Sequence, residues 1–381
     1  MATILLTGVT GLVGSCLAPL LQGAEHRILY LIRGGSKENA LARLHSSISK
    51  IGLNDIVLAG DVRLPNAGLS QEDLAYWEGR IDKIIHSAGS IKFDESAGPD
   101  TWETNVGGTK NILQLATRLK VPEFHFLSTA YIAGEAEMFQ ENDFNLQQKL
   151  RNAYEKSKME AERLVRSWPN IRYSIYRPSI VVGNSKTGYA KTLNGYYGFF
   201  IAFWQLRKSL TQRWITKKYE CLNEGIYINN EILHLPLAMQ CSTTSTLNLI
   251  PTDWLEEILP PLMELPATNQ TYHLVHPKPP RVQWIIEASL QYLKIGGLSY
   301  GVQPRFLPNT LLGRLQRGMN RKLDRYYPYI NHEALFLSSN LERTLGRKYV
   351  APPPIDAELL GKMLEYAKSI NFEQGTHVIA A

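Results

Sequence analysis

Cysteine is scarce in this chain, and long apolar runs are absent from it. The three cysteines among 381 residues (Cys16, Cys221 and Cys241) lack the spacing of metal ligands, so we expect neither a disulfide framework nor a metal site. No apolar stretch is long enough to span a bilayer, and the apolar N-terminus is interpreted as a first strand because it has no charged leader or cleavage site. A cytoplasmic protein without a transmembrane segment is the resulting expectation.

A strong charge of one sign is also missing. The net charge is only +6 and accompanies no nucleic-acid motif, so we expect no nucleic acid partner. A modest positive charge instead favours phosphate-bearing small molecules or an acidic protein partner. With 44% hydrophobic residues, the chain can bury one large core and a smaller substrate region. The oligomeric state is not indicated.

A glycine loop follows the first apolar run of the chain. The run Ile4-Leu5-Leu6 is typical of a parallel strand buried on both faces, and a helical pattern begins after the loop. Glycines at this junction allow a tight turn and a close approach to a pyrophosphate, whose charge the free N–H groups of the helix would meet. We therefore expect cofactor contacts from Gly8, Thr10, Gly11, Leu12, Val13 and Gly14.

Strand and helix patterns alternate through the first half of the chain, which predicts a Rossmann-type, doubly wound parallel α/β sheet. The expected strands are 28–32, 56–59, 83–86, 124–127 and 172–176, and the expected helices lie near 38–50, 71–77, 101–119 and 150–167. After Gly183 the pattern becomes irregular, and the prolines of Pro260–Pro280 predict a loop. We expect a cofactor domain over residues 1–183 and a substrate-binding cap over 184–381, with a segment at about 245–276 returning to the core.

The second expected strand lacks the acid that usually binds the ribose 2′-hydroxyl of NAD. Arg33 stands there instead, and its guanidinium could pair with a 2′-phosphate, so we expect NADPH, with NADH as the weaker option. Arg43 could clamp the same group, although both arginines could also be ordinary surface residues. Asp61 and Val62 are expected to face the adenine. The segment Ser87-Ala88-Gly89 would let the backbone approach the dinucleotide.

Three side chains are candidates for the chemistry: Thr129, Tyr154 and Lys158. Tyr154 and Lys158 are four residues apart and hence share a helix face, where the ammonium would lower the pKa of the phenol and let it exchange a proton. Thr129 follows a central strand, where a hydroxyl could hydrogen-bond a substrate carbonyl beside the phenol. Ser128 is the competing hydroxyl. Lys158 is also expected to bind the nicotinamide ribose.

Several segments carry a resemblance to a known family. The Gly-x-x-Gly-x-x-Gly spacing of the loop resembles short-chain dehydrogenases/reductases of the extended type. The chain is closer still to the fatty acyl-CoA reductases and the thioester reductase domains of carboxylic acid reductases and of nonribosomal peptide or polyketide synthases. The segments that carry this closer likeness are Ile84–Glu95, Asn105–Thr109, Leu127–Tyr131 and Tyr176–Ile180. Asn105, Pro178 and Ile180 are cofactor-binding positions by this resemblance, whereas residues 186–246 match nothing.

Two features of the second half leave alternatives open. The aromatic run Gly195–Trp204 could be core of the cap, a substrate tunnel or lid, or a membrane-surface contact. A basic stretch could be a solvated helix face or a dock for a phosphopantetheine-bearing carrier protein or for coenzyme A phosphates. Its members are Arg305, Arg314, Arg317, Arg321, Lys322 and Arg325.

The resemblance implies an NADPH-dependent reductase of a hydrophobic substrate, an acyl thioester linked to coenzyme A or a carrier protein, giving an aldehyde or an alcohol. A ketone reductase or hydroxyl dehydrogenase acting on a hydrophobic secondary metabolite or sterol-like molecule is the main alternative. A sugar-nucleotide epimerase fits Arg33 and the aromatic cap less well, and a non-catalytic dinucleotide sensor fits the Thr129, Tyr154 and Lys158 set less well.

Overall fold

The computed structural model describes residues 1–381 except 25, 49, 92–97, 194, 302–307 and 373–381. The chain forms two compact units. The first unit comprises Met1–Ser179, Thr252–Pro277 and Ala334–Pro352, and the second comprises Ile180–Pro251, Lys278–Glu333 and Pro353–Ala381. That cofactor binding and substrate binding divide between two domains stays a prediction.

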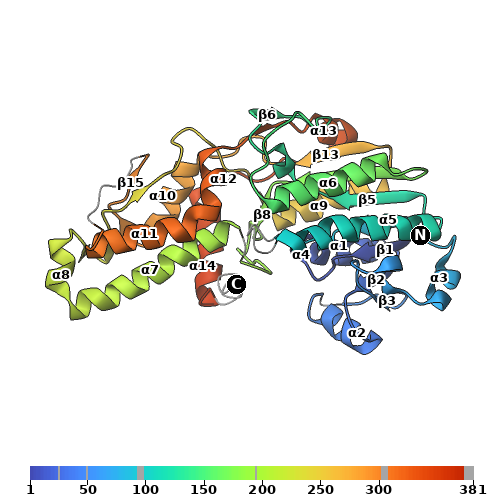
Figure 1. The fold of residues 1–381 in the computed structure, drawn as a ribbon, viewed down its shortest axis with the longest axis horizontal. Coiled ribbons are helices and arrows are strands. Elements are labelled where there is room, and N and C mark those ends of the chain that lie inside the picture. Colours follow the sequence, from blue (N-terminus) through green and yellow to red (C-terminus); the bar gives the residue numbers. More distant parts are fainter. Residues whose placement is uncertain (25, 49, 92–97, 194, 302–307, 373–381) are drawn as a thin grey trace. The chain divides into compact units, whose positions relative to one another are not determined.

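The first unit is built on a seven-stranded parallel sheet (Figure 1). Its strands are β1 (Thr3–Thr7), β2 (Arg27–Ile32), β3 (Ile56–Ala59), β4 (Lys83–His86), β5 (Glu123–Leu127), β7 (Arg172–Pro178) and β13 (Gln270–Leu274). Their spatial order is β13-β7-β5-β4-β1-β2-β3, so the direction of strand addition reverses at β1. Thr7 pairs with His86 there, and ligands of open α/β sheets bind at such a switch point, beyond the carboxyl ends of the strands.

Helices cover both faces of this sheet. They are α1 (Leu12–Gly23), α2 (Lys37–His45), α3 (Gln71–Trp77), α4 (Gly98–Trp102), α5 (Gly108–Arg118), α6 (Ala153–Ser167), α9 (Thr252–Glu264) and α13 (Ser339–Leu345). Helices α1 and α9 pack together on one face, and α5 and α6 pack together on the other (Figure 1). A small pair of strands, β6 (Met138–Phe139) and β16 (Leu335–Phe336), lies beside the sheet.

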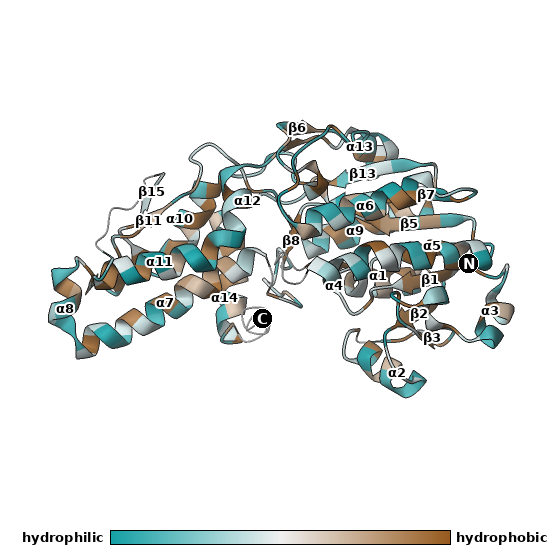
Figure 2. Cartoon of the chain, in the orientation of Figure 1, coloured by the Kyte–Doolittle hydropathy of each residue, from teal (hydrophilic) through white to brown (hydrophobic). Residues whose placement is uncertain are grey.

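The central strands form as expected because their side chains are apolar on both faces. Leu5, Leu29 and Ile84 are each fully buried, and Leu5 pairs with both of the other two. Figure 2 shows the central strands as predominantly hydrophobic. The predicted doubly wound parallel sheet is confirmed.

The second unit is mainly helical. Its helices are α7 (Tyr196–Thr216), α8 (Lys218–Asn223), α10 (Val282–Tyr292), α11 (Leu311–Leu323), α12 (Tyr327–Asn331) and α14 (Ala357–Ser369). Among the short strands, β10 (Ile232–His234) pairs with both β9 (Tyr227–Asn229) and β14 (Ile295–Gly296). In addition, β11 (Ala238–Met239) pairs with β15 (Ser299–Tyr300), and β8 (Ile180–Val182) pairs with β12 (Leu249–Pro251). Among the described residues, no helix is long and apolar enough to cross a membrane.

The aromatic run of the second unit packs in its core. Phe199, Phe200 and Phe203 of α7 are buried, and their rings contact one another. The neighbouring phenols are held by hydrogen bonds: Gly183 N–H donates to Tyr197 Oη at 3.0 Å, and Tyr196 Oη lies 3.2 Å from the Ser289 hydroxyl. These contacts favour the core interpretation of the run over a lid or a membrane-surface contact.

The predicted loop over Pro260–Pro280 is wrong. Residues 252–264 form α9, which contains Pro260 and Pro261, and residues 270–274 form β13. The apolar residues Trp254, Ile258 and Leu262 recur at helical spacing and are buried, so packing outweighs the hydrogen bonds that the prolines remove. The loop was predicted from the proline content alone, and the helical spacing of the apolar residues was not taken into account.

Candidate cofactor and active site

The glycine loop joins β1 to α1 with very little space around it. Gly8 has φ +77°, and a Cβ on it would lie 2.4 Å from the backbone N of Ala88. A Cβ on Gly14 would lie 2.3 Å from the Gly8 carbonyl oxygen. Gly11 precedes α1 without a capping side chain, and Thr10, Leu12 and Val13 complete the turn and open the helix. A side chain at Gly8 or Gly14 would therefore clash with backbone, and this glycine cradle, Gly8–Gly14, fits a pyrophosphate at a helix N-terminus.

A buried histidine ties the ends of β1 and β4 together. Thr7 Oγ1 lies 2.7 Å from His86 Nδ1 and accepts a hydrogen bond from Ala88 N–H at 3.2 Å. The Thr109 hydroxyl donates to the Asn105 carbonyl, so His86 Nε2–H donates to Thr109 at 3.2 Å and His86 Nδ1 accepts from Thr7. Burial, and secondarily the Lys158 charge, lower the pKa of His86 to about 3, so the ring is neutral. Sequence reasoning missed this residue, although it ends a predicted strand.

Asn105 lies in a π-helical turn, Glu103–Gly107, between α4 and α5. Its Oδ1 accepts from Ser90 N–H at 2.7 Å, and its Nδ2 donates to the Ser157 hydroxyl at 2.8 Å. Ser157 in turn donates to the Tyr154 carbonyl. Asn105 therefore joins the segment after β4 to the first turn of α6. In that segment, a Cβ on Gly89 would lie 3.1 Å from Asn105 Oδ1.

The three candidate catalytic side chains come together in the first unit. Asn152 caps α6 by accepting from the Glu155 N–H, which places Tyr154 in the first turn and Lys158 one turn later. Tyr154 is hydrogen-bonded to the Thr129 hydroxyl, just beyond β5. Lys158 Nζ donates to the Leu127 carbonyl and lies 4.4 Å from the centre of the Phe126 ring.

Burial moves the pKa values of this pair in opposite directions. The pKa of Tyr154 is raised to about 12, mainly by burial, with a smaller lowering from its Thr129 hydrogen bond. The pKa of Lys158 is lowered by burial to about 8, against the opposing charge of Glu162. The expectation that Lys158 lowers the pKa of Tyr154 is therefore corrected: burial dominates. The phenol stays protonated near neutral pH, which is the form that can donate a proton.

The residues proposed for the adenosine end are only partly brought together. Hydrogen bonds from Arg63 lower the pKa of Asp61, and the nearby Arg33 charge adds a smaller lowering. Arg33 is exposed just after β2. Arg43 is also exposed but lies near the end of α2, about 10 Å along that helix from its start, and no contact in the described residues joins it to Arg33. Val62 accepts a hydrogen bond from Asn111 through its carbonyl.

The remaining predicted positions are dispersed. Pro178 ends β7, and its carbonyl lies 3.5 Å from the Thr129 hydroxyl. Ile180 begins β8 in the second unit and donates its N–H to Asn248. The Lys92–Glu95 part of the family-like segment and Arg305 of the basic stretch lie outside the described residues. Within the described ranges, no three His, Cys, Asp or Glu side chains are grouped for a metal ion, and the expectation of no metal stays a prediction.

A parallel sheet with a glycine cradle at its switch point, and with a phenol and an ammonium on one face of a later helix, defines an extended short-chain dehydrogenase/reductase. The chain belongs to the male sterility protein family of NAD-binding domains, whose model matches residues 6–224, more than half of the chain. The predicted family and the prediction of an oxidoreductase are both confirmed.

Known proteins similar to this chain include parts of large biosynthetic enzymes. Over 200 residues, 48% of this chain, it is 31% identical to a linear gramicidin synthase of Brevibacillus parabrevis. Over 220 residues, 50% of this chain, it is 28% identical to the large chain of the L-2-aminoadipate reductase of Candida glabrata. The chain spans only 4% and 16% of the lengths of those two proteins.

Solved structures agree on the fold over nearly the whole chain. The terminal R domain of the myxalamid PKS-NRPS biosynthetic pathway has a TM-score of 0.73 at 23% identity, covering 98% of this chain and 92% of that one. A thiolation-reductase di-domain from an archaeal non-ribosomal peptide synthetase has a TM-score of 0.67 at 17% identity, covering 97% of this chain and 76% of that one. At these identities the likeness establishes the fold.

Proposed function

We propose that this protein is an NADPH-dependent reductase that converts an acyl thioester into an aldehyde, or onward into an alcohol. The observation that carries the proposal is the hydrogen-bonded Thr129–Tyr154 pair with Lys158 one helical turn away, at the carboxyl end of β5. The family match to an NAD-binding domain and the fold shared with terminal reductase domains support it.

The residues of this site can stabilise the carbonyl oxygen and supply its proton. Bound at the Gly8–Gly14 cradle, a reduced nicotinamide dinucleotide supplies hydride to the carbonyl carbon. Tyr154, protonated because burial raises its pKa to about 12, donates the proton to the oxygen, and the Thr129 hydroxyl holds that oxygen by a hydrogen bond. The Lys158 ammonium stabilises negative charge as it develops on the phenol. Loss of thiol from the reduced carbon then leaves the aldehyde.

The substrate is proposed to be hydrophobic and linked to a carrier protein or to coenzyme A. Arg314, Arg317 and Arg321 follow one face of α11 and are exposed, with Arg325 continuing the same row, so this face suits an acidic or phosphate-bearing partner. The archaeal relative, a thiolation domain joined to a reductase domain, supports a carrier-linked substrate. A cytoplasmic location stays a prediction.

The decisive experiment compares thioesters with ketones of matched size. Acyl-CoA and acyl carrier protein substrates are offered with NADPH, while NADPH absorbance and a thiol-reactive dye are followed together. We expect thiol release in step with NADPH oxidation. Turnover of ketones alone, with no thiol from any thioester, would replace the proposal with a ketone reductase or hydroxyl dehydrogenase.

Tyr154→Phe tests the proton donor in the same assay. The substitution keeps the ring and removes the acid, so turnover should fall by about 10²–10⁴ while NADPH still binds. Tyr76→Phe, at an exposed tyrosine of α3, is the matched control and should retain wild-type turnover. Near-normal turnover of Tyr154→Phe would refute the assignment.

A further inference from the structure

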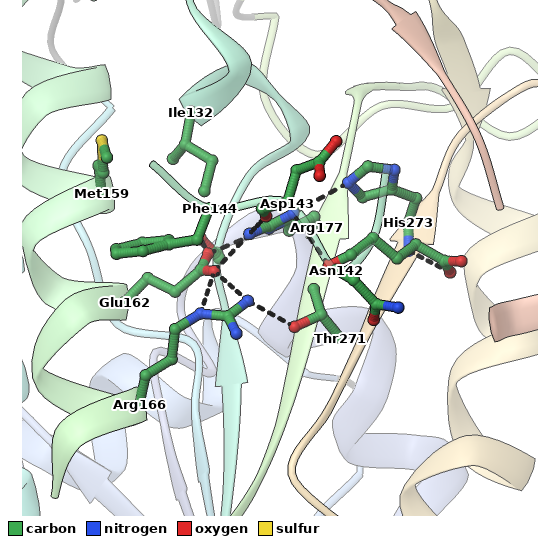
Figure 3. Close-up of polar contacts among 12 residues, drawn as sticks. Ile132, Asn142, Asp143, Phe144, Met159, Glu162, Arg166, Arg177, Thr271 and His273 are labelled. Atoms are coloured by element: carbon green, nitrogen blue, oxygen red, sulfur yellow. Dashed lines mark hydrogen bonds and ion pairs between the residues drawn. The ribbon is translucent and has the colours of Figure 1, made fainter. Parts of the chain in front are cut away.

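A cluster of buried charges lies beside the proposed active site, in the first unit. Glu162 of α6 and Arg177 of β7 are both fully buried, and Arg177 donates to the Glu162 carboxylate from Nη2 at 2.6 Å and from Nε at 3.2 Å (Figure 3). Arg166, one turn beyond Glu162, donates to the same carboxylate from Nε at 2.9 Å and from Nη2 at 2.8 Å. One carboxylate thus receives two guanidinium groups.

Arg177 is in turn fixed on its far side. Its Nη2 donates to the Asp143 carbonyl at 2.8 Å, and its Nη1 lies 3.2 Å from His273 Nε2 (Figure 3). His273 can accept there because its ring is neutral: burial lowers its pKa to about 3, and its Nδ1–H donates to the Leu337 carbonyl. The guanidinium therefore has little freedom to move, and neither has the carboxylate that it holds.

The same carboxylate also contacts the segment that follows β5. The Ser128 hydroxyl donates to Glu162 Oε2 at 2.7 Å, and Ser128 directly precedes Thr129. On α6, Glu162 lies one turn after Lys158, and its negative charge favours the ammonium form of Lys158. Glu162 thus contacts the segment that carries the hydroxyl and acts electrostatically on the ammonium.

We propose that Glu162, clamped by Arg166 and Arg177, is a positioning residue that fixes Ser128–Thr129 against α6 and so sets the geometry of Thr129, Tyr154 and Lys158. A buried ion pair gives little net stability compared with apolar packing, because desolvation offsets the attraction. The desolvation cost of burying Glu162 is consistent with a positioning role, because its carboxylate joins α6 to the segment that follows β5. The inference rests on the proposed roles of Tyr154 and Lys158.

Glu162 also bears on the pH range in which the site works. Among the described residues, Lys158 is approached by His86 from β4, by Gly89 after it, by the Phe126 ring and Leu127 carbonyl from β5, and by Glu162 from its own helix. His86 is neutral, so Glu162 supplies the negative charge that opposes burial at Lys158. Removing that charge lowers the pKa of Lys158 further and moves the alkaline fall of activity to lower pH.

The test uses Glu162→Gln, Glu162→Asp and Ser128→Ala, with Glu160→Gln as the matched control. Glu160 is on the same helix and pairs with Arg163 on its exposed side. Glu162→Gln should lower kcat about tenfold or more and move the alkaline limb of kcat/KM down by about one pH unit. Glu162→Asp keeps the negative charge, so the alkaline limb of kcat/KM should lie at its wild-type pH. Ser128→Ala should lower kcat with KM and the limb unchanged, and Glu160→Gln should match the wild type.

Two results would overturn the inference: Ser128→Ala with wild-type kcat, or a folded Glu162→Gln with an unmoved alkaline limb. If Glu162→Gln does not fold because two guanidinium groups are left buried without their partner, Ser128→Ala decides, since it removes only a neutral hydroxyl. Tyr154→Phe separates this inference from the proposed function. Wild-type turnover in Tyr154→Phe would refute the proposed function. Loss of turnover in Tyr154→Phe together with wild-type kcat in Ser128→Ala would refute only the role of Glu162.

Discussion

At the scale of single residues, burial decides which protonation states the site holds. A phenol and an ammonium in the same low-dielectric surroundings both shift toward their neutral forms. The raised pKa of Tyr154 keeps the phenol protonated, whereas the lowered pKa of Lys158 means that the ammonium loses its proton not far above neutral pH. The Ser128 and Thr129 hydroxyls also differ in their partners, since Ser128 is bound to Glu162 and Thr129 to Tyr154. These contacts support Thr129 rather than Ser128 as the hydroxyl that meets substrate.

The pKa of Lys158 predicts the alkaline limit of activity. The ammonium is present below pH 8 and lost above it, because burial lowers the pKa of Lys158 to about 8. We expect kcat/KM to fall above that pH in steady-state profiles. Lys158→Arg keeps a positive charge throughout this pH range, so the alkaline fall of kcat/KM should disappear, even if turnover is lower. A wild-type profile that stays flat to pH 10 would contradict this role.

Arg33 predicts the choice of cofactor. Losing a hydrogen bond to a charged group costs about 1.5–3 kcal/mol, so Arg33→Ala should weaken NADPH binding roughly tenfold to a hundredfold and leave NADH binding nearly unchanged. Fluorescence titration with both cofactors measures the difference. Arg80→Ala, which removes a cation stacked on Tyr76, is the control and should alter neither. Equal losses for NADPH and NADH in Arg33→Ala would dismiss the 2′-phosphate contact.

At the scale of elements, the junction of β1 with α1 is the most constrained part of the proposed cofactor site. Gly8→Ala would place a methyl group against the backbone of Ala88 at a positive φ, which strains the turn and fills the cradle. We expect NADPH binding to be lost in a titration, while the circular dichroism spectrum remains that of the folded protein. Gly361→Ala, where nothing lies within 4 Å of the new Cβ, is the control and should bind normally. Wild-type affinity in Gly8→Ala would rule out this cradle.

The elements also show what could be predicted from the sequence. Six of the seven parallel strands were predictable to within a residue or two, because buried runs such as Ile56–Ala59 and Lys83–His86 depend on local composition. The seventh, β13, was missed because it lies inside the predicted loop. The candidate catalytic residues were predictable because Tyr154 and Lys158 share one helix and their spacing is visible. The Glu162–Arg177 pair was not, since its partners are 15 residues apart and meet only when α6 packs on β7. In α9, burial of one helix face outweighed the local signal of two prolines.

At the scale of the whole molecule, the two units bury different chemistry. The first unit encloses charged and titratable side chains, among them His86, His273 and the Glu162–Arg177 pair. The core of the second unit is built from apolar side chains and the aromatic rings of α7. Protonation therefore acts mainly on the first unit, and the two units should respond differently to acid.

The neutral buried histidines predict how the first unit loses stability on acidification. Burial lowers the pKa of both His86 and His273 from near 6.5 to about 3, so between these values the unfolded chain binds protons that the folded chain does not. Stability is full above pH 6.5 and declines as pH falls toward 3, by about 1.4 kcal/mol per pH unit for each histidine once the unfolded side chain is protonated. Hydrogen exchange at pH 7 and pH 5, corrected for the intrinsic rate, should show weakened protection in β4 and β13 and little change in α7 and α10. His273→Gln should reduce the loss, whereas His45→Gln, at an exposed position, should leave it unchanged. Equal weakening in the two units would show that these histidines do not control the response.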